Sequence, residues 1–151
     1  MSPELEIARQ WVAKAQNDLL NADNNLTAVN VPFDTVCFHC QQAAEKLLKA
    51  ALVAKGVPPP RTHILLVLMD EIAPISPSVE TLREDLVILT PYAVSARYPD
   101  DESDMPTLED AREARQCAER VLTWFQSACP LGSLALWGHT PAIDFLRSVK
   151  E

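Results

Sequence analysis

The chain has 151 residues, of which 48% are hydrophobic and 23% are charged, and a single globular domain is expected at this length. Its 13 basic and 21 acidic residues give a formal net charge of -8, which argues against broad binding to nucleic acid or to an anionic membrane. Only three glycines are present, so the clustered glycines of phosphate-binding loops and dinucleotide folds are missing.

The N-terminal segment is acidic and amphipathic, without the apolar stretch of a signal peptide or a membrane span, so we expect a cytoplasmic protein. From residue 3 to 28, apolar side chains recur at three- and four-residue spacing, which predicts a helix with one apolar face. Ser2 and Pro3 give a start signal, because a capping hydroxyl precedes a ring whose missing N–H costs nothing at the first helical position.

A second helix is predicted from Pro32 to about Lys55, with Gly56 ending it. One face is apolar, and the other is polar and charged. After a stiff connection at residues 58–60, Thr62 is expected to cap a short apolar helix from His63 to about Ile72.

Ser76 and Pro77 then restart a helix, which Pro91 should kink or end before residues 92–98. A loop is expected at residues 99–106. Thr107 and Asp110 form a capping box for a long helix that continues through Phe125. Beyond Pro130 the chain is unusually apolar, and Thr140 with Pro141 predicts a last short helix.

No strand-like alternation competes with these helices. The predicted fold is all-α, an up-and-down bundle of four long helices with a short extra helix between the second and the fourth. We assign residues 1–129 to the bundle and residues 130–151 to an apolar C-terminal extension, docked on the bundle or on a partner. The four cysteines are expected to be reduced and buried. The CFHC string lacks a second ligand pair, so no metal is predicted, and no cofactor either.

Four strings stand out by their order along the chain. They are FHCQQAAEKLLKA (Phe38 to Ala50) in the second helix, Trp11 with Asp18 in the first, Thr62-His63 at the start of the third, and Arg97-Tyr98-Pro99-Asp100. Together they resemble the HEPN family, the higher-eukaryote and prokaryote nucleotide-binding helical bundle, over about residues 3–128. The resemblance implies a bundle that often dimerises, is frequently encoded beside a minimal nucleotidyltransferase, and in many members is a metal-independent ribonuclease toxin.

The resemblance also implies a catalytic signature, an arginine followed after four to six residues by a histidine. An imidazole can move a proton on the ribose 2'-hydroxyl, and a guanidinium can stabilise the phosphate. Arg97 matches the arginine, but Glu102, Ser103 and Asp104 occupy the positions of the histidine. The acidic residues that follow Arg97 would repel a phosphate, so RNA is not the expected ligand.

Six residues are candidates for ligand binding: Arg97, Tyr98, Gln42, Lys46, Lys49 and His63. Gln42, Lys46 and Lys49 lie one or two helical turns apart and would line an anion site, whereas Glu45 and Lys49 also have the spacing of a simple surface pair. We expect His63 to be a hydrogen-bonding surface or interhelical residue rather than a catalyst. Arg97 and Tyr98 either cap a helix end or bind the ligand.

The leading hypothesis is a non-catalytic or weakly active interaction module. It would form a homodimer, helped by the apolar extension, and partner a nucleotidyltransferase-type protein in a system like a toxin–antitoxin pair. Two alternatives stay open. One is a metal-independent ribonuclease toxin with an atypical site around Arg97, and the other is a nucleotide-binding bundle that uses Lys46 and Lys49.

Overall fold

The computed structural model describes residues 2–94, 105–129 and 131, and within these ranges all regular structure is helical. The elements in chain order are α1 (Pro3–Leu26), α2 (Phe33–Ala54), α3 (Leu65–Ile72), the 3-10 helix η1 (Pro77–Leu82), α4 (Arg83–Leu89), the 3-10 helix η2 (Thr90–Ala93) and α5 (Leu108–Ala128). The predicted all-α class is confirmed for this part of the chain.

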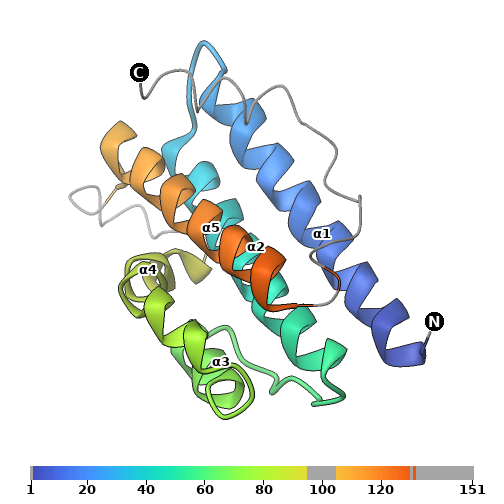
Figure 1. Cartoon of the computed structure of the whole chain (residues 1–151). Coiled ribbons are helices and arrows are strands. Elements are labelled where there is room, and N and C mark those ends of the chain that lie inside the picture. Colours follow the sequence, from blue (N-terminus) through green and yellow to red (C-terminus); the bar gives the residue numbers. More distant parts are fainter. Residues whose placement is uncertain (1, 95–104, 130, 132–151) are drawn as a thin grey trace.

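Three long helices, α1, α2 and α5, lie alongside one another, and the short α3 and α4 lie away from α1 (Figure 1). The predicted fourth long helix does not form as one helix, because residues 77–93 are divided among η1, α4 and η2. α4 ends at Leu89, just before Pro91, which has no backbone N–H to continue the helix. The predicted break at Pro91 is therefore confirmed, and residues 95–98 lie outside the described residues.

Local signals set several helix ends as predicted. The Ser2 side chain accepts a hydrogen bond from the Leu5 N–H at the start of α1, and Thr107 and Asp110 form the predicted capping box of α5. Gly56 follows α2 with a φ of 75°, a left-handed conformation that favours glycine.

The start of α3 differs from the prediction. Thr62 does not cap it, because the Thr62 Oγ1 accepts a hydrogen bond from the Ile64 N–H, 3.0 Å away, in a local turn. His63 lies in the connection before the helix, and α3 begins at Leu65 after the N-cap residue Ile64.

α2 is the central helix, since it contacts α1, α3, α4, α5 and η2. Its polar face is largely buried: Gln41 is fully buried, and Glu45 and Lys49 are 3% and 8% exposed. The predicted pairing of Glu45 with Lys49 does form, with 3.2 Å between Lys49 Nζ and Glu45 Oε2. It is a buried pair, however, and not the predicted surface pair.

Small side chains let the long helices approach closely. The fully buried alanines of α1, α2 and α5 are Ala8, Ala15, Ala22, Ala43, Ala44, Ala50, Ala111, Ala114 and Ala118. The four cysteines, all in the described ranges, are buried and form no disulfide, as predicted. Leu131, which follows the last helix, is also buried in the core.

None of the helices that the structure describes has the length and apolar content that crossing a bilayer requires.

Candidate functional site

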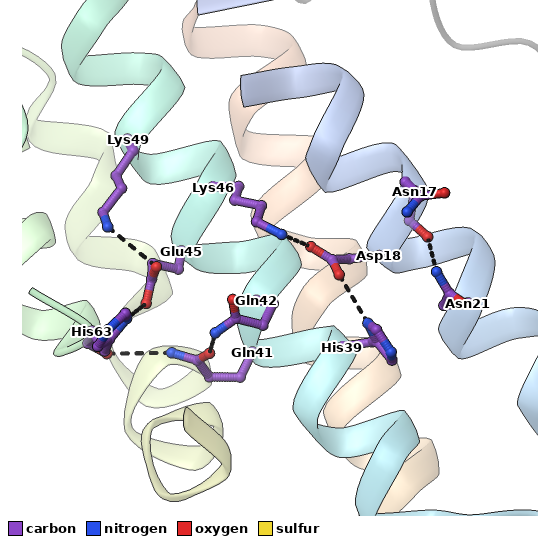
Figure 2. Close-up of polar contacts among 10 residues, drawn as sticks. All are labelled: Asn17, Asp18, Asn21, His39, Gln41, Gln42, Glu45, Lys46, Lys49 and His63. Atoms are coloured by element: carbon purple, nitrogen blue, oxygen red, sulfur yellow. Dashed lines mark hydrogen bonds and ion pairs between the residues drawn. The ribbon is translucent and has the colours of Figure 1, made fainter. Parts of the chain in front are cut away.

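A row of polar residues follows one side of α2 and meets α1 and the connection before α3 (Figure 2). We call it the α2 polar seam. It comprises Asp18 of α1, His63 of the connection, and His39, Gln41, Gln42, Glu45, Lys46 and Lys49 of α2. The spacing of His39, Gln42, Lys46 and Lys49 brings them to one side of the helix.

Asp18 organises the half of the seam that faces α1. Its Oδ1 lies 2.8 Å from the Nδ1 of His39, and its Oδ2 accepts a hydrogen bond of 2.5 Å from the Nζ of Lys46. The Asp18 side chain is only 7% exposed. Since an ionised carboxylate only accepts hydrogen bonds, the proton of a neutral His39 is placed on Nδ1.

Glu45 organises the other half in the same way. Its Oε1 lies 2.9 Å from the Nδ1 of His63, and its Oε2 accepts a hydrogen bond of 3.2 Å from the Nζ of Lys49. The Lys49 ammonium also lies 5.6 Å from the ring centre of Trp11 in α1, within the range of a cation–π contact. The seam thus contains two similar clusters. In each one, a buried carboxylate contacts both a histidine and a lysine.

The two glutamines continue the seam toward the connection. Gln42 donates through Nε2 to the side-chain oxygen of Gln41, 2.8 Å away, and Gln41 donates to the carbonyl of His63, 3.3 Å away. Since Glu45 holds the His63 side chain and Gln41 holds its carbonyl, α2 fixes both parts of this residue.

Gln42, Lys46 and Lys49, the residues of the predicted anion site, lie on one side of α2, but Lys46 points to Asp18 and Lys49 points to Glu45 (Figure 2). Lys46 and Lys49 each contact a buried carboxylate. His63 makes the hydrogen bond expected of it. The candidates Arg97 and Tyr98 lie outside the described residues.

Sequence reasoning missed Asp18, His39 and Gln41 as members of this site. A signal for Asp18 was present, because this residue falls between Ala15 and Ala22 inside the apolar stripe of α1. A charged residue at such a position is buried and needs a partner. Nothing in the local pattern around His39 identified that partner.

Two further ion pairs join α5 to the rest of the bundle. Arg115 binds both carboxylate oxygens of Asp23, with distances of 2.6 and 3.2 Å. Burial alone would lower the pKa of the Arg115 guanidinium, but the hydrogen bonds and charge of Asp23 outweigh it and raise this pKa. Arg120 donates to Asp85 of α4 over 2.7 Å. These ion pairs connect α5 to α1 and to α4. Because each positive charge has a negative partner, the four residues form no exposed patch of a single charge.

Burial disfavours the reactive thiolate form of Cys40 and Cys117. Burial is the main cause, and a hydrogen bond to Asp85 the second, that raises the pKa of Cys117 to about 12. Burial also raises the pKa of Cys40. Reactive cysteines need the opposite shift. Within the described ranges, no group of three histidine, cysteine or acidic side chains is arranged to hold a metal ion.

Comparison with known proteins places the chain in context. A family model for the HEPN domain matches residues 8–128. The crystal structure of the protein TT1696 from Thermus thermophilus is similar, with a TM-score of 0.70 and 29% sequence identity over 80% of this chain and 97% of that one. A search of curated proteins found no match.

Proposed function

The chain belongs to the HEPN family, and we propose that it is a non-catalytic or weakly active interaction module that partners a minimal nucleotidyltransferase, as in a toxin–antitoxin pair. The observation that carries the proposal is the charge balance of the α2 polar seam. Lys46 and Lys49 each contact a buried carboxylate, that of Asp18 and that of Glu45. The seam therefore has no unbalanced lysine to offer an incoming phosphate.

Binding a nucleotide at this seam would require the lysines to leave their partners. Asp18 and Glu45 would then keep only their histidine contacts, and breaking a buried ion pair costs about 3–5 kcal/mol. That cost opposes the nucleotide-binding alternative, which uses these two lysines.

The sequence supports the same conclusion at the family's catalytic position. Glu102, Ser103 and Asp104 occupy the positions after Arg97 where the signature has its histidine. A carboxylate there would repel the phosphate that the reaction must bind.

Cleavage assays test the non-catalytic part of the proposal. We expect purified protein to leave structured and unstructured RNA intact in the presence of a chelator. The matched control is Arg97→Ala, which should behave like the unchanged protein. RNA cleavage that disappears in Arg97→Ala would instead establish the ribonuclease alternative.

A thermal-shift titration tests the nucleotide alternative. A ligand that binds the folded state raises its melting temperature, so ATP and GTP should leave the melting temperature unchanged. A clear rise that is lost in Lys46→Ala would favour nucleotide binding at the seam.

Coexpression tests the partner. If the neighbouring gene encodes a minimal nucleotidyltransferase, the two proteins should copurify and elute together, with a light-scattering mass that includes both chains. Separate elution at micromolar concentration would contradict the interaction module.

We also propose that the chain is a homodimer to which the apolar extension contributes. A variant lacking residues 132–151 keeps the buried Leu131 and should show a lower light-scattering mass or a lower melting temperature than the full chain. No change in either quantity would contradict a role of the extension in assembly or in covering the bundle.

A further inference from the structure

We propose that His63 is an acceptor site for a phosphoryl group, with its Nε2 atom as the nucleophile and Glu45 as the residue that positions the ring. This inference is independent of the partner proposed above. It rests on the exposure of His63, on the contacts that hold it, and on a matched histidine in the same seam.

His63 combines an exposed ring with a buried anchor. Its side chain is 74% exposed, whereas that of Glu45 is 5% exposed, and 2.9 Å separates the His63 Nδ1 from the Glu45 Oε1. Because the carboxylate engages Nδ1, the lone pair of a neutral imidazole lies on Nε2. The ring is thus held by one nitrogen and can react through the other.

The backbone of His63 is held as well. The buried Gln41 donates from Nε2 to the His63 carbonyl over 3.3 Å, and the Thr62 hydroxyl closes a turn on the Ile64 N–H. The three prolines at residues 58–60 stiffen the approach to this turn. A fixed, exposed nucleophile loses little conformational freedom when it meets a small reactant.

The balanced charges around His63 permit the approach of a small anionic donor, without a lysine to hold it. Lys49 compensates the charge of Glu45 across 3.2 Å, so the carboxylate can hold the ring without making the site strongly negative. Arg61, exposed and two residues before His63, adds a positive charge on the same connection.

The chemical step is a substitution at phosphorus. The Nε2 lone pair forms a bond to the phosphorus of a phosphoramidate or an acyl phosphate, and the bond from phosphorus to the leaving group breaks. Ammonia or a carboxylate leaves with that electron pair. The ring becomes an imidazolium whose Nδ1 proton stays hydrogen-bonded to Glu45, which stabilises the positive charge as it develops.

His39 is a matched control within the same seam. Its Nδ1 also faces a buried carboxylate that binds a lysine, namely Asp18 with Lys46, but the His39 side chain is only 22% exposed. If exposure together with anchoring determines reactivity, His63 should react and His39 should react slowly.

The test treats the folded full-length protein with phosphoramidate at pH 8 and follows each histidine by mass spectrometry under non-acidic conditions. We expect phosphorylation of His63 to exceed that of His39 by at least about tenfold, and Glu45→Gln to slow it by about tenfold, a factor typical of losing a hydrogen bond to a charged group. His63→Gln should remove the acid-labile adduct at position 63 and leave only slow reaction elsewhere, and His39→Gln should leave the His63 rate unchanged.

Glu45→Gln separates a positioning role from a structural one. If Glu45 only fastened the connection, its loss would release an already exposed ring, and the rate at His63 would stay the same or rise. That outcome would overturn the proposal, as would equal rates at His63 and His39. Should Glu45→Gln unfold, which circular dichroism would show, the comparison of His63 with His39 in the unchanged protein still decides, because His63 must react at least about tenfold faster than His39.

Discussion

Asp23 shows how far a single buried charge depends on its partner. Its side chain is 1% exposed and binds Arg115, 92 residues away in the sequence, through two hydrogen bonds. Arg115 has a second and more exposed partner in Glu119, 3.1 Å away. The two charges join the C-terminal part of α1 to α5, and removing one of them leaves the other in the core.

We expect Asp23→Ala to lower the free energy of unfolding by about 3 kcal/mol, because it leaves the Arg115 charge buried with only Glu119 nearby. Urea denaturation followed by circular dichroism measures this loss. The control is Glu109→Ala, which removes an exposed partner of Arg112 and should change stability by less than about 1 kcal/mol. Equal losses in the two variants would show that burial does not determine the cost.

At the scale of the element, α5 has the most complete start signal in the described part of the chain. Thr107 accepts a hydrogen bond from the Asp110 N–H, and the Asp110 side chain accepts one from the Thr107 N–H, with distances of 3.2 and 2.9 Å. Two backbone donors of the first turn are thereby satisfied. This box fixes where α5 begins after the segment that follows η2.

Thr107→Ala removes the capping hydroxyl and should cost about 1 kcal/mol of stability. The change is read from the urea midpoint. Thr123→Ala is the control, because Thr123 is exposed within the same helix and alanine is the better helix former. The cap would be unimportant if Thr107→Ala left the midpoint as high as Thr123→Ala does.

Helix ends with local chemistry could be predicted from the sequence, whereas those set by distant contacts could not. Ser2, Gly56 and the Thr107 box act within a few residues of themselves, so the pattern contains the whole cause. The connection before α3 is held in part by the contact of His63 with Glu45, 18 residues earlier, and no local pattern shows this contact.

The candidate site was predictable to a similar extent. Helical spacing shows that Gln42, Lys46 and Lys49 share one side of α2, since residues three and four apart are neighbours on a helix. The spacing did not show that α1 and the connection before α3 cover this side of α2. Periodicity identifies the residues that share a face, but it does not identify the segments that pack against that face. The carboxylate of Asp18, which balances Lys46, arrives from another helix.

At the scale of the whole molecule, several groups resist ionisation when the chain folds. Burial raises the pKa values of Cys117 and Tyr92, each to about 12, from 9.0 and 10.0. The same cause raises the pKa values of Cys40 and Cys129. The folded protein therefore retains protons that the unfolded chain releases in alkaline solution.

Stability should consequently fall as the pH rises from about 9 toward 12. A raised pKa in the folded state contributes stability that is complete below the unfolded value and is lost as the pH passes through the folded value. Urea midpoints at about pH 8, 10 and 11 measure the decline. Cys117→Ala removes one of the responsible groups, so its decline should be shallower. A decline as steep as that of the unchanged protein would assign the effect to other groups.

The central position of α2 bears on how the protein can be labelled or varied. This helix contacts every other α-helix in the described part of the chain, so most of its side chains have little room for a larger group. A spectroscopic probe on α2 therefore has few attachment points, which are the incompletely buried positions Phe33, Asp34, Thr35, Phe38, His39, Gln42, Lys46, Val53 and Ala54. Three of these positions belong to the α2 polar seam, namely His39, Gln42 and Lys46. A probe attached there would report on the seam but would also disturb its contacts.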